Sequence, residues 1–276
     1  MLVNSNELFM KARKGNYAIP AANYIDLDSA RSYIKVAEQK RLPLILAFAQ
    51  SHKDILSLEE AALIGKFLGE KASVPIVLHL DHGEDYDFIE RAIRLGFTSV
   101  MIDASQKKFD ENIQVSKEVV ELAHKFDISV EAELGHVGSN QISFEQGKPD
   151  SIYTETESVI EFVDKTKVDS LAISIGTAHG LYKGTPKINF ERLHEIRKLT
   201  DVPLVLHGGS SSGDLNLERC ATEGISKINI YTDFLMGAQH EIEENGYQNY
   251  IELKNLANDG MEKVLEHYYK VFHTKL

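Results

Sequence analysis

The stretch Pro75-Ile76-Val77-Leu78-His79-Leu80-Asp81-His82-Gly83-Glu84 joins an apolar run to a cluster of polar groups at its end. Its β-branched and aliphatic residues are typical of a buried strand, and proline is tolerated at a strand's first position. Because successive side chains of a strand alternate between its faces, His79 and Asp81 share one face. His82 follows where the strand turns into Gly83. One interpretation is that Asp81 is a carboxylate for proton transfer and His82 an imidazole that binds a metal. Whether this interpretation is supported depends on which residues end the other strands.

The rest of the chain repeats this pattern of a short apolar run followed by an amphipathic segment. We expect eight strands, at residues 17–23, 43–49, 75–80, 98–103, 128–134, 169–174, 203–207 and 227–230. Helical spacing follows at residues 28–39, 86–95, 110–126, 158–165, 190–199, 215–222, 233–244 and 247–271. A further helix is expected to begin after Ser57, which would cap it, with Glu60 completing a capping box. Near-continuous hydrophobicity in the strands indicates a parallel sheet covered on both faces. The sequence therefore predicts an α/β protein, a (β/α)8 TIM barrel with an additional C-terminal helix.

A doubly wound open sheet is the competing architecture. Its dinucleotide-binding version needs a GxGxxG turn after the first strand, which this sequence lacks. No linker rich in proline, glycine or serine interrupts the chain, so we expect one domain over residues 1–276.

Composition narrows the classes of partner. The chain has 276 residues, 43% of them hydrophobic, and a formal net charge of −12, which argues against nucleic acid or an anionic membrane as a partner. It leaves room for an anionic small substrate, because backbone amides can bind phosphate whatever the net charge. Cys220 is the single cysteine, so no intrachain disulfide is expected. No signal peptide and no apolar run approaching ~20 residues is found, and we expect a soluble, cytoplasmic protein.

Polar residues stand at the expected carboxyl ends of the strands, where the chemistry of such barrels gathers. They are Asn23, Gln50, Asp81, His82, Asp103, Glu131, Glu133, His179, His207 and Asn229. Three of them are histidines, after the third, sixth and seventh strands, and three imidazoles around an open fourth position are typical of catalytic Zn2+. Taken singly, a histidine is more commonly structural or on the surface, and we assign that role to His52, His124, His194, His240, His267 and His273. His79 is interpreted as packing beside the ligands, and His136 stays open.

Glycine-rich turns form a second constellation. Gly208-Gly209-Ser210 follows the seventh strand, and Asn229-Ile230-Tyr231-Thr232-Asp233 ends the eighth and opens a helix. Loops at these two places are the usual phosphate cradle of the barrel, because glycine lets backbone N–H groups approach phosphate oxygens. The alternative is a tight turn in which Thr232 or Asp233 caps the helix. Beside a metal site, phosphate binding is the favoured interpretation.

Six segments together resemble the signatures of the class II zinc-dependent ketose-bisphosphate aldolases, a family that includes fructose-bisphosphate and tagatose-bisphosphate aldolases. They are residues 74–82, 130–135, 169–173, 176–180, 203–210 and 227–233. The resemblance implies a (β/α)8 barrel and reversible retro-aldol cleavage of a ketose (bis)phosphate to dihydroxyacetone phosphate and an aldehyde. It also implies a homodimer or homotetramer.

The same resemblance implies roles for individual residues. His82, His179 and His207 would be the zinc ligands, Asp81 the acid/base on the C4 hydroxyl, and Asp103 and Glu133 groups near the metal, with Glu133 touching an alternative zinc position. The residues that would hold dihydroxyacetone phosphate, with a monovalent cation (Na+ or K+) often alongside, are Gly180, Gly208, Gly209, Ser210, Asn229, Thr232 and Asp233.

The chain departs from the family pattern at three places. Residues 135–141 lack the acidic cluster that supplies the C3 proton, so we expect Glu145, or else His136, to take this role. The loop at 49–54 lacks the usual small residues, and the tail lacks the Asp-Pro-Arg segment that can bind the distal end of the sugar. The substrate is therefore open, and a non-bisphosphate sugar is an alternative.

Two other functions remain as alternatives. A metal-dependent TIM-barrel hydrolase would need metal ligands on the first strand, usually a His-x-His, where Asn23 stands instead. A catalytically weak barrel kept for binding would account for the altered loop after the fifth strand, but not for intact Asp81 and the three histidines.

Overall fold

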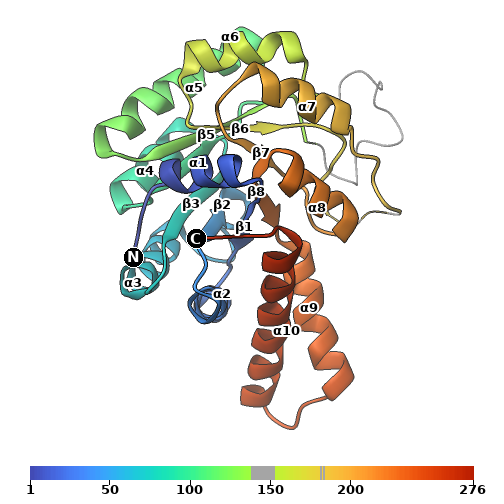
Figure 1. Ribbon diagram of the computed structural model, residues 1–276. Helices are drawn as coiled ribbons and strands as arrows, with labels where there is room; N and C mark the ends of the chain where they lie inside the picture. The colour runs from blue at the N-terminus through green and yellow to red at the C-terminus, as the bar shows by residue number, and fades with distance from the viewer. Residues whose placement is uncertain (138–152, 181, 183) are drawn as a thin grey trace.

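Eight parallel strands close into a barrel in sequence order (Figure 1). The structure is a computed structural model, and it describes residues 1–137, 153–180, 182 and 184–276. The strands are β1 (Ile19–Asn23), β2 (Leu44–Ala49), β3 (Ile76–Gly83), β4 (Ser99–Ile102), β5 (Ser129–Leu134), β6 (Ser170–Ile173), β7 (Leu204–Leu206) and β8 (Ile225–Ile230). The predicted (β/α)8 barrel is confirmed, with β3 running further than predicted and β8 beginning earlier.

Helices surround the barrel and extend beyond its last strand. They are α1 (Asn6–Gly15), α2 (Leu27–Lys40), α3 (Leu58–Lys71), α4 (Tyr86–Leu95), α5 (Phe109–Ala123), α6 (Thr156–Thr166), α7 (Phe190–Leu199), α8 (Asp214–Glu223), α9 (Thr232–Asn245) and α10 (Tyr250–Val271), with short 3-10 turns η1 (Gln50–His52) and η2 (His124–Phe126). The predicted capping box of α3 is present, since the side chains of Ser57 and Glu60 each accept a hydrogen bond from the other's backbone N–H. The helix α1 was not predicted.

Two apolar cores stabilise the barrel. One lies between the strands and the surrounding helices. The other lies inside the barrel, where α1 and Tyr17 pack on inward-facing strand residues. From α1 it contains Leu8, Phe9 and Ala12, and from the strands Ile19, Ala21, Ile45, Val77, Ala172 and Val205. In Figure 1 α1 crosses the amino-terminal end of the strands, so this end is closed and the carboxyl ends are left for a site.

The end of β3 is irregular. Its pairing with β4 shifts register between Leu80 and Gly83, and His82 has a positive φ of 47°, a left-handed conformation that histidine adopts more readily than most residues. In a regular strand Asp81 and His82 would point to opposite faces, whereas a bulge re-aims a side chain. Here both residues face the same cavity. The backbone distortion thus makes the Asp-His pair usable as one unit.

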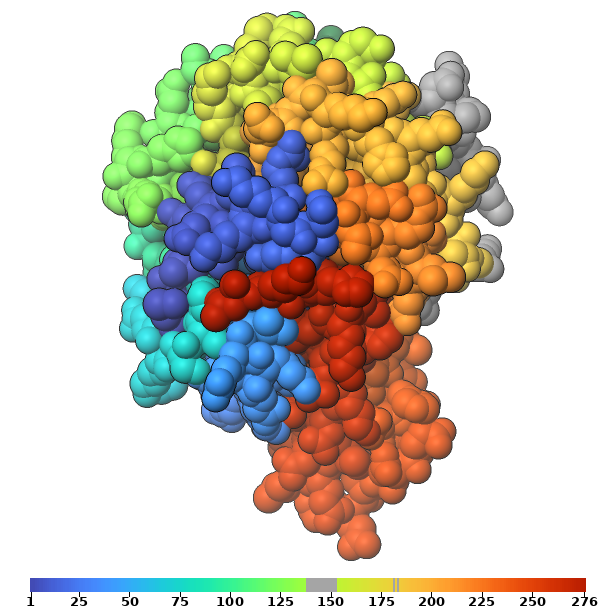
Figure 2. Space-filling view, in the orientation of Figure 1, coloured from blue at the N-terminus to red at the C-terminus, as the bar shows by residue number. Residues whose placement is uncertain are grey.

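The last two helices extend away from the barrel. Figures 1 and 2 show α9 and α10 as an antiparallel pair that projects from one side of the molecule, and α10 then packs on α2. Within the described residues, no helix combines the length and the apolar character that crossing a membrane requires.

Candidate active site

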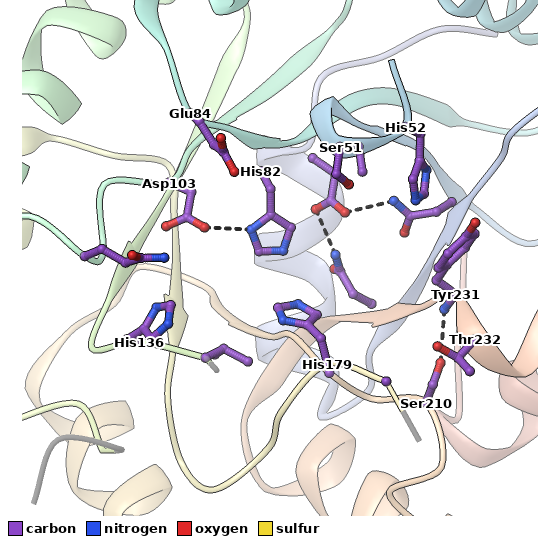
Figure 3. A pocket seen from close by; sticks show the side chains of 18 residues that line it. Ser51, His52, His82, Glu84, Asp103, His136, His179, Ser210, Tyr231 and Thr232 are labelled. Carbon is purple, nitrogen blue, oxygen red and sulfur yellow. Dashed lines mark hydrogen bonds and ion pairs between the residues drawn. The ribbon is translucent and has the colours of Figure 1, made fainter. Parts of the chain in front are cut away.

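A cavity of about 660 Å³ opens at the carboxyl ends of the strands (Figure 3). Each of the eight strands, or the loop after it, contributes to its wall, which is formed by Asn23, Ala49, Ser51, His52, Asp81, His82, Glu84, Asp103, Gln106, His136, Val137, His179, Gly180, Gly208, Ser210, Asn229, Tyr231 and Thr232. Most of the polar residues predicted at strand ends therefore meet in one place. His207, Glu131 and Glu133 are buried next to this wall.

Three histidines from distant parts of the chain converge at the cavity. The ring centroids are 4.5 Å apart for His82 and His207, 4.9 Å for His82 and His179, and 6.0 Å for His179 and His207. A ring nitrogen of each lies within 4.8 Å of one from each of the others. Burial and the neighbouring His82 and His207 rings lower the pKa of His179 to about 3. A neutral imidazole is the form that binds a metal.

The orientation of two of these rings is fixed by carboxylates. His82 Nδ1 lies 2.8 Å from Asp103 Oδ2, and His207 Nε2 lies 2.8 Å from Glu131 Oε1. If each carboxylate accepts an N–H, the two remaining ring nitrogens carry lone pairs. These nitrogens, His82 Nε2 and His207 Nδ1, face each other at 2.9 Å. Two lone pairs this close repel each other, and a proton or a metal ion between them removes the repulsion.

Carboxylates surround His82. Burial opposes protonation of His82, but the negative charge of Asp81, the hydrogen bond to Asp103 and the charge of Glu133 outweigh it and raise its pKa to about 9. The same hydrogen bond and the His82 charge overcome the effect of burial on Asp103 and hold the pKa of that carboxyl well below its usual range. The position between the histidines thus attracts positive charge.

A second set of metal-binding side chains shares His82, together with Asp103 and Glu133. Glu133 Oε1 accepts a hydrogen bond from the Val137 N–H at 2.9 Å. Its Oε2 is buried and has no hydrogen-bond partner among the described residues. Burial and the nearby Asp103 charge raise the pKa of Glu133 to about 8. An unpartnered buried oxygen in one group with the His82 ring and the Asp103 carboxylate fits a divalent metal, and imidazole and carboxylate are donors that Zn2+ takes.

Two amides hold the Asp81 carboxylate. Asn23 donates to Oδ2 and Asn229 donates to Oδ1, each at 2.8 Å. Burial would raise the pKa of Asp81, but the positive charges of His82, Lys227 and other neighbours lower it well below its ordinary value. At neutral pH this residue is therefore a carboxylate, aimed into the cavity and able to accept a proton.

A buried polar network lies beneath the histidines, and sequence reasoning did not find it. Lys227 Nζ contacts Glu131 Oε2 at 2.8 Å and His79 Nε2 at 3.1 Å, and His79 Nδ1 lies 2.9 Å from Ser99 Oγ. The interpretation of His79 as a residue that packs beside the ligands agrees with this position. A lysine within the apolar run of β8 is the one signal that could have pointed to the network, since a buried lysine needs an acidic partner.

The loops after β6, β7 and β8 form the other end of the cavity. Ser210 Oγ accepts hydrogen bonds from the backbone N–H groups of Tyr231 at 3.1 Å and Asp233 at 3.3 Å, at the start of α9. Gly208 has a φ of +65°, and a Cβ there would lie 2.5 Å from the Ala178 carbonyl oxygen. Glycine is required here because the turn after β7 packs against the loop that carries His179.

Two residues predicted to bind phosphate do not line the cavity. The Asp233 carboxylate accepts hydrogen bonds from the Ser211 N–H and hydroxyl, each at 3.0 Å, and from the Tyr268 hydroxyl. The Gly209 N–H donates to the Asn229 carbonyl at 3.1 Å. Gly209 therefore connects the turn after β7 to β8, and Asp233 connects that turn to α10.

His52 was predicted to be structural or on the surface, and the structure places it in the wall of the cavity. Its ring lines the cavity and packs on the Tyr231 ring, with centroids 4.5 Å apart. It is placed there by η1, which turns the chain inward after β2. His136 also lines the cavity, with Nδ1 3.1 Å from Ser105 Oγ, whereas Glu145 lies outside the described residues.

Comparison with known proteins decides the family. A family model described as class-II fructose-bisphosphate aldolase matches residues 3–275. The chain belongs to the class II fructose-bisphosphate aldolase family. As a member of it, the protein is an aldolase and hence a lyase, as the sequence motifs predicted.

Individual relatives agree with this assignment. The D-tagatose-1,6-bisphosphate aldolase subunit GatY of Klebsiella oxytoca is 39% identical over 248 residues, which are 88% of this chain and 87% of the relative. The crystal structure of the YdjI aldolase from Escherichia coli K12 has a TM-score of 0.89 at 33% identity, covering 99% of this aldolase and 98% of YdjI. The crystal structure of a putative fructose-1,6-bisphosphate aldolase from Coccidioides immitis has a TM-score of 0.86 at 28% identity, covering 97% of this chain and 95% of that relative.

Proposed function

We propose that this aldolase reversibly cleaves a ketose phosphate between C3 and C4, giving dihydroxyacetone phosphate and an aldehyde, with Zn2+ held by His82, His179 and His207. The observation that carries the proposal is the convergence of three imidazoles beside the Asp81 carboxylate. Bound zinc would act as a Lewis acid that stabilises negative charge on the substrate's C2 oxygen. Glu133 would touch an alternative position of the metal, with Asp103 near it, and the second group of donors, His82, Asp103 and Glu133, supports this.

Asp81 performs the proton transfer at C4. As the C3–C4 bond breaks, the carboxylate takes the proton of the C4 hydroxyl, C4 becomes the aldehyde carbon, and the electron pair of the bond passes to C3 and the C2 oxygen. A proton added at C3 completes dihydroxyacetone phosphate, and condensation reverses each step. The amides of Asn23 and Asn229 hold the carboxylate in position for this transfer and leave it ionised.

The phosphate on C1 would occupy the end of the cavity formed by Gly180, Gly208, Ser210 and Thr232. The amino-terminal end of α9 lies there and favours an anion through its dipole. Gly209 and Asp233 would act by holding these loops, and the buried Asn229 Oδ1, unpartnered among the described residues, is free to accept a substrate hydroxyl. A monovalent cation beside the phosphate remains part of the proposal.

The group that moves the C3 proton is assigned from the sequence. Glu145 is our first choice, and His136, which lines the cavity, is the alternative. Exchange of the C3 proton of dihydroxyacetone phosphate with D2O, followed by NMR, reports this step without any aldehyde. Glu145→Gln is expected to abolish the exchange and His136→Gln to leave it, and the reverse result would assign the role to His136.

The proposal is tested with the zinc-loaded protein and candidate ketose phosphates of both C4 configurations. Release of dihydroxyacetone phosphate, measured with a coupled dehydrogenase, should disappear after complete metal removal and return on adding Zn2+. Full activity without metal would rule the proposal out. Release of inorganic phosphate in place of dihydroxyacetone phosphate would favour a hydrolase. A metal-dependent hydrolase would need metal ligands on the first strand, where the amide of Asn23 donates a hydrogen bond to Asp81 instead.

A further inference from the structure

The rim of the cavity formed by the loops after β2, β3 and β4 carries uncharged polar side chains and one carboxylate. We call Ser51, His52, Glu84 and Gln106 the β2–β4 rim. In a closed ring of eight strands, β3 lies across from β7 and β4 across from β8. Glu84 and Gln106, after β3 and β4, therefore lie across from the loops proposed to hold the C1 phosphate, whereas His52 also contacts Tyr231 beside those loops. A ketose bound by its C1 phosphate would direct its carbons beyond C4 toward the rim.

Side-chain contacts hold this rim in place. The buried Gln50 donates from Nε2 to Asp85 Oδ2 at 2.7 Å, and its Oε1 accepts the Glu84 N–H at 2.8 Å. This joins the turn that carries Ser51 and His52 to the loop that carries Glu84. The contact between the His52 and Tyr231 rings supports the same wall from the side of β8. The rim is thus a preformed surface.

The charge of the cavity differs between its two ends. Among the residues described as lining it there is no lysine or arginine, while three carboxylates, those of Asp81, Glu84 and Asp103, line it. Burial lowers the pKa of His52, against the opposing charge of Asp81, so its ring is neutral at neutral pH. A phosphate is bound by arginine, lysine or a cluster of free backbone N–H groups. The rim offers none of these side chains, and Glu84 would repel a second phosphate.

We infer that the aldehyde half of the substrate is an uncharged polyhydroxylated chain, so that the substrate carries a single phosphate, on C1. This inference rests on the proposed function and specifies the substrate class of the same site. The Glu84 carboxylate would accept hydrogen bonds from the hydroxyl groups of this chain. The side chains of Ser51, His52 and Gln106 could each donate a hydrogen bond to these hydroxyl groups or accept one from them.

The test runs the reaction in the direction of condensation. The zinc-loaded protein is given dihydroxyacetone phosphate with D- or L-glyceraldehyde, the matching glyceraldehyde 3-phosphates, or unphosphorylated four- and five-carbon aldoses. We expect kcat/KM for the best uncharged aldehyde to exceed that for either phosphorylated aldehyde at least tenfold. A preference for a phosphorylated aldehyde, whatever residue or partner subunit supplies its binding site, would overturn the inference and leave the aldolase assignment intact.

A charge reversal tests the rim directly. Glu84→Lys should move the ratio of kcat/KM values at least tenfold toward the phosphorylated aldehyde, and Glu84→Gln should move it part of the way. Glu7→Lys on α1, an exposed acid on the closed end of the barrel, makes the same charge change and should leave the ratio unchanged. An equal effect of Glu84→Lys and Glu7→Lys would contradict the assignment of the rim. Deuterium exchange at C3 of dihydroxyacetone phosphate separates the two proposals, because its absence would count against the proposed function itself.

Discussion

The Lys227 ammonium group and the Glu131 carboxylate form an ion pair of 2.8 Å inside the barrel, where both side chains are almost completely buried. The other Glu131 oxygen contacts the ring of His207, a proposed zinc ligand, at 2.8 Å. The pair therefore connects the core of the barrel to the metal centre. Lys227 and neighbouring histidines outweigh burial and lower the pKa of Glu131 to about 2, so the carboxylate is ionised throughout the neutral range.

Removing the lysine leaves a buried charge without a partner. We predict that Lys227→Met lowers the free energy of unfolding by about 3–5 kcal/mol, the usual effect of breaking a buried pair. Urea unfolding of the chelator-treated protein measures this, and the double variant Lys227→Met/Glu131→Gln should recover part of the loss. A loss below about 1 kcal/mol would show that the pair is not buried as described.

Glu131→Gln tests the link to the metal. The amide keeps the shape of the side chain but no longer holds the His207 N–H with a charged acceptor, so zinc affinity should fall about 10- to 100-fold. Competition with a chelator of known affinity gives the zinc dissociation constant. Glu161→Gln, which removes an acid of an exposed ion pair on α6, is the control and should leave that constant unchanged.

Asp81→Ala should separate chemistry from metal binding. Loss of a general acid or base typically lowers turnover about 10²- to 10⁴-fold. Zinc content, measured by mass spectrometry of the purified protein, should stay at the level of the unmodified protein. Unchanged turnover with a cognate ketose phosphate would instead support a barrel that does not use this carboxylate.

His79 should make the protein sensitive to acid. Burial and the Lys227 charge lower the pKa of His79 to about 3, from an ordinary value of 6.5. Below pH 6.5 the unfolded chain binds a proton that the folded protein does not, so stability falls as the pH drops from 6.5 toward 3, by about 1.4 kcal/mol per pH unit.

Between pH 7 and pH 5, this contribution of His79 amounts to about 2 kcal/mol. His79→Gln should reduce the loss of unfolding free energy over that interval by this amount, as measured by urea unfolding at both pH values. His240→Gln, at an exposed position, serves as the control. Equal pH dependence in all three proteins would contradict the prediction.

Local signals predicted much of the fold. The predicted bounds of α4 and α7 agree with those in the structure, where the Asp85 side chain caps α4, Gly96 ends it, and the Asn189 side chain caps α7. The predicted end of β3 was too early, since the bulge and the left-handed His82 extend its pairing to Gly83.

Contacts between distant strands could not be predicted in the same way. Lys227 and Glu131 are 96 positions apart, and only closure of the barrel makes them neighbours. The place of His52 in the cavity wall could not be predicted, because nothing in its local sequence shows that η1 turns it onto Tyr231. The three histidines were found because each lies at the end of an apolar run or within a few residues of it, which is a local signal for a shared edge.

The arrangement of the strands in a ring bears on how substrate preference can diverge. The proposed phosphate-binding loops follow β6, β7 and β8, whereas the β2–β4 rim is built on the opposite arc. Loop substitutions on that arc can exchange one aldehyde for another while the shared reaction intermediate keeps its binding site. A single ancestral chemistry can therefore supply many sugar pathways through changes confined to one side of the barrel mouth.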